Sequence, residues 1–187
     1  MNDWDTYIAI TANKPPRPLL IEAISLCVKR ESALDLGAGG LNEARYLTEH
    51  GFKVVAIDSN PSVATLAGNL DVQIMRIEEY EYPLSSFDLV ISLYTLPFIQ
   101  EKTLPVVLKK ITETLRVSGI FAAQFFGLRD SWSGRCITHT KDEIRNLVSG
   151  LGLSIIKLEE REYDQPTAAG KPKHWHVFEV IARKSTR

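Results

Sequence analysis

Two kinds of apolar pattern alternate along the chain. Continuous apolar runs, typical of buried strands, alternate with segments whose apolar residues lie three or four positions apart, as on one face of a helix. The predicted strands cover residues 32–35, 53–58, 72–77 and 87–92, a fifth includes 120–121, and two more cover 153–158 and 175–182. The predicted helices cover residues 19–27, 44–50, 61–70 and 104–115, and another opens at 140–143 with a capping box.

This alternation predicts an α/β fold. Right-handed crossovers between successive strands give a doubly wound, mostly parallel sheet of seven strands. The last two strands are joined by a polar loop without a helix, so we expect an antiparallel hairpin at the C-terminal end of the sheet. We expect one domain over residues 1–187, with 19–187 as its core and 1–18 as an N-terminal lid or connector.

The N-terminal segment allows two arrangements. Trp4 and Tyr7 either fold over a ligand as a lid or pack on the outside of the sheet. The proline-rich stretch Lys14–Pro18 is expected to act as a stiff connector, because successive prolines disfavour a helix.

The most informative motif is the glycine turn after the first strand, Asp35-Leu36-Gly37-Ala38-Gly39-Gly40-Leu41-Asn42. Glycine permits a sharp turn and lets a ligand approach the backbone more closely than a Cβ allows. A dinucleotide site would need glycine or alanine at the position of Asn42, and a phosphate-binding loop would need a Gly-Lys-Ser/Thr sequence, which the chain lacks. The Asp35 carboxylate would repel a pyrophosphate, but it suits a ligand with a cationic amino group, such as S-adenosylmethionine.

A second anchor is the strand 53–58, which ends in Asp58. Asp58 follows the glycines by about 20 residues, the spacing at which a strand-end acid binds ribose hydroxyls. Asn60 and Pro61 come next, as the expected cap and first residue of a helix. The two motifs together predict a nucleoside ligand at the carboxyl ends of the first strands.

With these motifs the chain resembles the class I S-adenosylmethionine-dependent methyltransferases over about residues 19–182. The glycine turn is similar to the first motif of that family, Asp58 to its second, 87–92 to its fourth, and 115–119 to its Leu-x-Pro-Gly-Gly turn. Leu41 stands where the family has its last glycine, and we expect it to narrow the cofactor slot. Val117-Ser118 replaces Pro-Gly in the later turn. Within the family, the likeness is to small bacterial methyltransferases of the tellurite-resistance type.

The resemblance implies a Rossmann-like methyltransferase fold and S-adenosylmethionine as the cofactor. Its motifs imply cofactor contacts from the following residues: Asp35, Gly37, Ala38 and Gly39 at the methionine part, Asp58 and Ser59 at the ribose, Ile77 and Glu78 at the adenine, and Ser92 at the border with the acceptor. A solvated acidic loop is the alternative for Glu78. Because the methyl group is already activated on the sulfonium, a general base is needed only if the acceptor must lose a proton.

Acceptor contacts are expected in the loops at the same edge of the sheet. Tyr94 follows the fourth strand, and Arg129 and Trp132 follow the fifth. All three are candidates for binding the acceptor, and Arg129 is also a weak candidate for catalysis. Packing explains Tyr94 equally well, and an ion pair between Arg129 and Asp130 is the alternative for that segment.

Two histidines open the last strand. His174 and His176 are two residues apart and therefore share one face of the strand with Phe178. A general base for the acceptor, acceptor binding by His176, and ordinary packing are the alternatives. We expect no metal site, because no further ligands stand out.

Composition limits the partners. The net charge of −1 argues against nucleic acid, which usually requires a basic surplus. The sequence shows no charged-then-apolar leader and no apolar run near 18 residues, so we expect no membrane segment and a cytoplasmic location. Cys27 and Cys136 lie far apart in the sequence without paired-ligand spacing, so we expect neither a disulfide nor a zinc framework.

Together these features favour an S-adenosylmethionine-dependent methyltransferase that acts on a small molecule by direct displacement. One alternative is a non-catalytic S-adenosylmethionine-binding sensor or partner subunit. Another is a nicotinamide oxidoreductase that uses Asp58 on the ribose. The sequence leaves open the acceptor atom (oxygen, nitrogen, sulfur or a metalloid), the oligomeric state and the physiological role.

Overall fold

The computed structural model describes residues 3–185. Residues 1–2 and 186–187, which the single-domain prediction includes, lie outside this range. The strands are β1 (Ser32–Leu36), β2 (Lys53–Asp58), β3 (Asp71–Ile74), β4 (Phe87–Ser92), β5 (Leu115–Gly127), β6 (Thr138–His139), β7 (Leu153–Asp164) and β8 (His174–Lys184). The α-helices are α1 (Asp3–Thr11), α2 (Pro18–Ser25), α3 (Asn42–Glu49), α4 (Leu104–Thr114) and α5 (Lys141–Gly150), and the 3-10 helices are η1 (Pro61–Leu66), η2 (Leu96–Phe98) and η3 (Glu101–Thr103).

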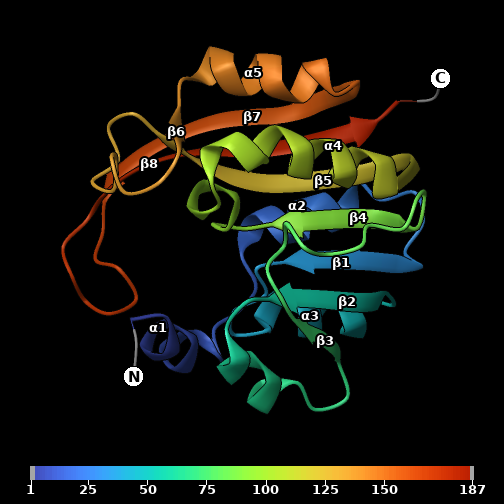
Figure 1. The fold of residues 1–187 in the computed structure, drawn as a ribbon, viewed down its shortest axis with the longest axis horizontal. Helices are drawn as coiled ribbons and strands as arrows, with labels where there is room; N and C mark the ends of the chain where they lie inside the picture. Colours follow the sequence, from blue (N-terminus) through green and yellow to red (C-terminus); the bar gives the residue numbers. More distant parts are fainter. Residues whose placement is uncertain (1–2, 186–187) are drawn as a thin grey trace.

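The strands form one mixed sheet in the order β3-β2-β1-β4-β5-β8-β7, and the short strand β6 pairs with the end of β5 (Figure 1). From β3 to β5 every neighbouring pair is parallel. β8 is antiparallel to β5, and β7 is antiparallel to β8. The predicted α/β fold, with a mostly parallel sheet and a C-terminal antiparallel hairpin, is therefore confirmed.

Helices cover both faces of the sheet. In Figure 1, α4 lies in front of the strands, α2 and α3 lie behind them, and α5 packs along β7. Leu34 of β1, Leu108 of α4 and Ile144 of α5 belong to one buried apolar cluster. Leu20 of α2 and Leu47 of α3 belong to a second cluster on the other face. Neighbouring side chains along a strand point to opposite faces, so the same buried strands supply both clusters.

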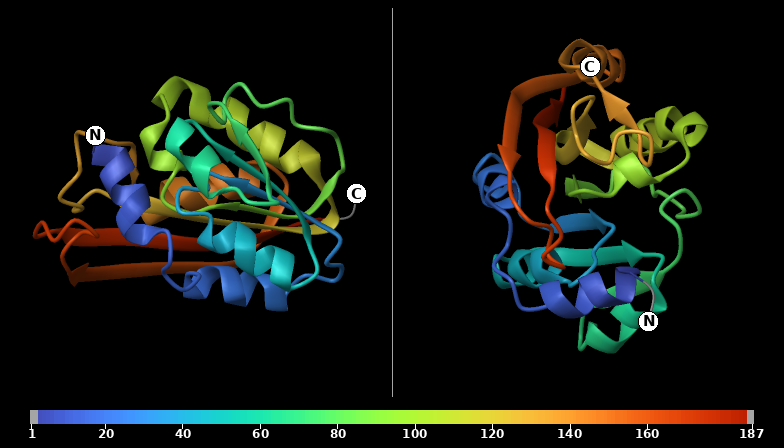
Figure 2. Two further views of the ribbon diagram at one scale, coloured as in Figure 1. Left: turned by 90° about the horizontal axis from the view of Figure 1, so that it is seen from below. Right: turned by 90° about the vertical axis from the view of Figure 1, so that its left-hand side faces the viewer.

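Three strands continue beyond the edge where the parallel strands end. Ser92, the last residue of β4, pairs with Ala123, whereas β5 runs on to Gly127 beside β8 and β7. These continuing residues (124–127, 159–164 and 174–179) form what we call the sheet extension. The carboxyl ends of β1, β2 and β4, helix α1 and the loop between β7 and β8 all lie at this end of the molecule (Figures 1 and 2).

Several predicted boundaries differ from the structure. The helix predicted over 61–70 is the 3-10 helix η1, which ends at Leu66, and Gly68 then adopts a left-handed conformation (φ 56°) that interrupts a helix. The strand predicted over 72–77 ends at Ile74. Both predicted caps are confirmed, because Asn60 accepts the N–H of Ser62 and Thr140 forms a capping box. Among residues 3–185, no helix has the length and apolar character required to cross a bilayer.

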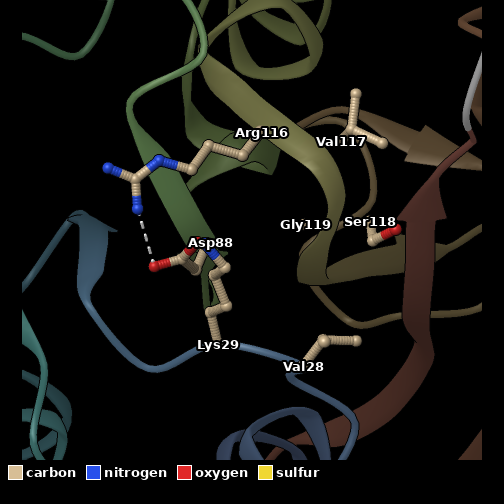
Figure 3. Close-up of a pocket in the computed structure, with 7 residues that line it drawn as sticks. All are labelled: Val28, Lys29, Asp88, Arg116, Val117, Ser118 and Gly119. Atoms are coloured by element: carbon tan, nitrogen blue, oxygen red, sulfur yellow. Dashed lines mark hydrogen bonds and ion pairs between the residues drawn. The ribbon is translucent and has the colours of Figure 1, made fainter.

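A cavity of about 350 Å³ lies at the opposite, amino end of the strands (Figure 3). Asp88 and Arg116 line it and form an ion pair at 3.0 Å. The Asp88 carboxylate also accepts the N–H groups of Glu31 and Ser32, each at 3.0 Å. These charged groups find their partners within the protein and connect neighbouring strand ends. The cavity is separate from the glycine turn because the turn lies at the carboxyl ends of the strands.

Candidate functional site

The glycine turn joins β1 to α3 at the carboxyl edge of the sheet. Its backbone is left-handed at alternate residues, Gly37 (φ 81°), Gly39 (φ 48°) and Leu41 (φ 60°). The N–H groups of Gly37 and Ala38 donate to the carbonyl of Ile57 at 2.8 and 3.0 Å. These bonds attach the turn to β2 and hold the ends of two predicted motifs together.

Another loop lies so close to Gly37 that it leaves no room for a Cβ at this position. A Cβ on Gly37 would overlap the side chain of Thr95. Thr95 lies in the loop that follows β4, so this loop contacts the turn directly. Thr95 was not among the predicted site residues, although its position just after Tyr94 at a strand end was the available signal.

Leu41 shows how the turn departs from its usual glycine pattern. A left-handed backbone costs a residue with a Cβ about 1–2 kcal/mol. The Leu41 side chain is fully buried and belongs to the apolar cluster that includes Ala44 and Leu47 of α3. The expectation that Leu41 narrows the cofactor slot is therefore wrong, because its side chain packs into the core.

Asp58 at the end of β2 contacts the glycine turn. Its Oδ2 accepts the N–H of Gly39 at 2.8 Å, and its Oδ1 accepts the N–H of Asn60 at 2.8 Å. Asp58 is partly exposed, and Ser59 beside it is exposed. Each carboxylate oxygen retains a second lone pair, so the group can still accept hydroxyl donors from a ligand.

Asp35 is buried beside the turn, near the end of β1. Within residues 3–185, its Oδ2 has no hydrogen-bond partner. Burial raises the pKa of Asp35 well above its usual range, and the carboxylate of Glu43 adds to this effect, while Arg17 opposes it. A buried carboxyl acceptor without a donor is costly, and a ligand that brings a cationic donor would satisfy it.

Helix α1 and the segment after it lie over the turn. Arg17 pairs with Glu43 of α3 at 2.8 Å and donates to the hydroxyl of Tyr7 at 3.0 Å. A Cβ on Gly39 would lie 3.9 Å from the Tyr7 ring. Arg17 was predicted only as part of a stiff connector, because nothing in its local pattern indicates that the guanidinium reaches α3.

The expected adenine segment lies after β3. The carbonyl of Ile77 accepts the hydroxyl of Tyr82 at 2.9 Å, and the carbonyl of Glu78 accepts from Lys110 at 3.3 Å. The Glu78 carboxylate pairs with the exposed Arg76 at 2.6 Å. The backbone of Ile77 and Glu78 and the Glu78 carboxylate, whose oxygens each retain a lone pair, could still contact a base.

Ser92 and Tyr94 border the turn from the β4 side. Ser92 is fully buried at the end of β4, and its hydroxyl lies 3.4 Å from the carbonyl of Leu36. Tyr94 has a left-handed backbone (φ 61°), and its ring lies 5.7 Å from that of Phe126 and 5.6 Å from that of Trp175. Burial raises the pKa of Tyr94 above its usual range.

Arg129 and the two histidines form a charged network on the sheet extension. Arg129 pairs with Glu160 at 3.2 Å and with Glu162 at 2.5 Å. The expected ion pair between Arg129 and Asp130 is therefore wrong. The reason is that β7 runs alongside β8 further than its sequence pattern suggested, and it brings these two glutamates to Arg129.

The imidazole of His176 is buried, and both of its nitrogens are engaged. Its Nδ1 accepts the N–H of Arg129 at 3.2 Å, so Nε2 carries the proton of the neutral ring and donates to Glu160 at 3.0 Å. A Cβ on Gly127 would overlap this ring. His174 is partly exposed and lies 2.8 Å from Asp164 and 3.0 Å from Glu162. This geometry favours packing and hydrogen bonding over proton abstraction.

Trp132 follows β5 and belongs to an aromatic group at the same end of the sheet. Its ring lies 5.7 Å from both Phe126 and Trp175. The neighbouring Asp130 and Lys173 form a buried ion pair. Within the described range, no three His, Cys, Asp or Glu side chains are arranged to hold a metal ion.

Residues 34–123 match the model of a known family, a methyltransferase domain. The matched segment runs from β1 through the glycine turn, Asp58 and β4 into β5. The match covers just under half of the chain and identifies this part as a methyltransferase domain, in agreement with the resemblance to the class I S-adenosylmethionine-dependent methyltransferases. Such a domain uses S-adenosylmethionine as its cofactor. No curated protein matches the sequence of this methyltransferase.

Solved structures share the fold of this methyltransferase at low identity. The 1,6-didemethyltoxoflavin-N1-methyltransferase of Burkholderia thailandensis, solved with 1,6-didemethyltoxoflavin and S-adenosylhomocysteine, is 21% identical with a TM-score of 0.73, over 98% of this chain and 82% of that one. TehB from Haemophilus influenzae is 17% identical with a TM-score of 0.77, over 97% and 67%. A methyltransferase in complex with the Trm112 activator of Haloferax volcanii is 14% identical with a TM-score of 0.73, over 100% and 99%.

Proposed function

We propose that this methyltransferase transfers the methyl group to a small-molecule acceptor by direct displacement. The observation that carries the cofactor part of the proposal is the buried Asp35 carboxyl, whose Oδ2 has no partner within residues 3–185. It lies next to a turn whose glycines leave the backbone open to a ligand. The ammonium of the methionine part would supply the missing donor.

The remaining cofactor contacts follow from the positions of the motifs. Gly37, Ala38 and Gly39 would hold the methionine part, and Asp58, with Ser59 beside it, would accept the ribose hydroxyls. Three further residues are proposed at the rim: Ile77 and Glu78 toward adenine, through their backbone or side chains, and Ser92 toward the acceptor. Arg17 and Tyr7 cover the turn from the α1 side and would exclude water from it.

Methyl transfer requires the protein mainly to align the acceptor with the methyl group of the cofactor. When bound, S-adenosylmethionine would supply an activated methyl group with a neutral thioether as the leaving group for an acceptor lone pair. The protein orients the acceptor in line with the methyl group and keeps water out. His174, His176 and Arg129 are held by Glu160, Glu162 and Asp164, so we assign none of them as a general base.

Two observations favour a small acceptor. The net charge of −1 gives no basic surplus for a nucleic acid. The neighbour solved with 1,6-didemethyltoxoflavin acts on a small molecule, although another neighbour is complexed with an activator protein. The assay described next therefore also asks whether the protein needs a partner subunit, because its panel includes protein extract.

The proposal is tested by following S-adenosylhomocysteine release with labelled S-adenosylmethionine. The acceptor panel combines small phenols, heteroaromatics, amines, thiols and tellurite with tRNA, DNA and protein extract. We expect saturable turnover with members of the small-molecule set. Turnover confined to a macromolecule would contradict the small-acceptor proposal, and cofactor binding with no turnover across the panel would contradict the transfer itself.

A further inference from the structure

Six aromatic side chains gather where β4 and β5 end, and we call them the aromatic wall. They are Trp4 of α1, Tyr94 and Phe98 after β4, Phe126 of β5, Trp132 of the next loop, and Trp175 of β8. Ring centroids lie 5.3 Å apart for Trp4 and Phe98, and 5.9 Å apart for Phe98 and Phe126. Trp4 is 50% exposed and Phe98 is 37% exposed, so the wall presents ring surface to an incoming molecule.

The wall adjoins the glycine turn on two sides. Thr95, in the loop that carries two rings of the wall, packs on Gly37. On the other side Tyr7 lies against Gly39, and its ring is in edge contact with Trp4 at a centroid distance of 6.0 Å. A flat molecule on the wall would therefore lie beside the proposed methyl donor.

A cation of the protein already occupies the inner side of the wall. The ammonium of Lys173 lies 5.0 Å from the ring centroid of Phe126, 4.1 Å from that of Trp132 and 4.4 Å from that of Trp175. These distances are within the range of cation–π attraction. Lys173 is buried and is held there by its pair with Asp130. The position that an aromatic cage would offer to a cationic ligand is filled.

A second cation lies at the edge of the wall. The guanidinium of Arg17 is 5.4 Å from the ring centroid of Tyr94. Its carboxylate partner, Glu43, lies on α3 behind the turn. Both cations are held by carboxylate partners, Asp130 and Glu43, so they occupy the cation–π positions of the wall. A cationic ligand would find these positions filled.

We infer that the methyl acceptor is a planar aromatic molecule, neutral or anionic, that stacks on the aromatic wall. This inference rests on the proposed function, since it assigns the acceptor side of the same site. Offset or edge-on ring contacts would supply affinity. Because Lys173 and Arg17 already occupy the cation–π positions, a ligand that carries an ammonium group would bind less tightly.

The test uses ligands that share a ring and differ in charge. Phenol is neutral, 4-hydroxybenzoate is anionic and tyramine is cationic, and cysteamine serves as an aliphatic control. The chain has three tryptophans, and all of them, Trp4, Trp132 and Trp175, belong to the wall, so intrinsic fluorescence reports its occupancy. Titrations are run with saturating S-adenosylhomocysteine, whose own binding is measured first by calorimetry.

We expect phenol and 4-hydroxybenzoate to bind at least about tenfold more tightly than tyramine. Trp4→Ala and Phe98→Ala should each weaken their binding about threefold to tenfold. Both variants should leave the affinity for S-adenosylhomocysteine unchanged. Leu84→Ala, which removes a side chain that is 74% exposed and is not part of the wall, should change neither affinity.

Each other outcome is decisive. Preferred binding of tyramine or cysteamine, or no binding of any ring compound while S-adenosylhomocysteine binds, would overturn the inference and leave the proposed function standing. Failure of S-adenosylhomocysteine itself to bind would overturn the proposed function, and the acceptor assignment with it.

Discussion

The Asp58 carboxylate accepts the backbone N–H of Gly39 at 2.8 Å, so the acid at the end of β2 and the glycine turn after β1 form one unit. Its other oxygen accepts the N–H of Asn60 and supports the start of η1. Asp58 therefore shapes the turn in addition to its proposed contact with the ribose. Cofactor affinity and local stability should depend on this side chain together.

Asp58→Ala should weaken S-adenosylhomocysteine binding by about 1–3 kcal/mol, the scale for losing hydrogen bonds to a charged group. Calorimetric titration measures this directly. Asp71→Ala removes an exposed carboxylate from the neighbouring strand β3 and serves as the matched control. Equal affinity in Asp58→Ala and wild type would remove the ribose assignment.

Leu41 combines a left-handed backbone with a fully buried side chain. Glycine in an ordinary element is less stable than alanine by about 0.5–1 kcal/mol. At Leu41 the order should reverse, because glycine relieves the strain at φ 60° and alanine does not. Both variants lose packing, so Leu41→Gly should unfold at a urea concentration equal to or above that for Leu41→Ala. A clearly less stable Leu41→Gly would show that the strain is absent.

Asp35 should make stability fall as pH rises. Its pKa is raised in the folded state, so between the unfolded value of about 3.9 and the higher folded value the native protein binds more protons than the unfolded chain. Asp35→Asn should therefore match wild type near pH 4 and be more stable by about 1–3 kcal/mol at neutral pH.

Urea unfolding at several pH values, with Asp71→Asn as the exposed control, measures this difference. The same Asp35→Asn variant should bind S-adenosylhomocysteine more weakly, because the ammonium loses its charged partner. A variant that is less stable than wild type at pH 8 would contradict the burial argument.

The fold was predictable because its signals are local and repeated. The apolar runs, the glycine turn and the caps at Asn60 and Thr140 each act within a few residues. The contacts among Arg17, Glu43 and Tyr7 were not predictable, since they join segments far apart in the sequence. The partners of Arg129 were missed for a related reason: an edge strand with exposed charges lacks the apolar pattern that marks a buried strand.

The buried pair of Lys173 and Asp130 should contribute strongly to folding. Lys173→Met leaves the Asp130 charge without its cation and should lower the free energy of unfolding by about 3 kcal/mol. The double variant Lys173→Met/Asp130→Asn should be more stable than the sum of its single changes predicts, as urea unfolding would show. Additive losses would mean that the two groups are not coupled.

The most direct test is calorimetric titration of the wild-type protein with S-adenosylhomocysteine, with NADH as the parallel control. The geometry at Asp35, the glycine turn and Asp58 predicts saturable one-site binding of S-adenosylhomocysteine and none of NADH. Binding of NADH alone, or of neither compound, would contradict the assignment of this turn to S-adenosylmethionine.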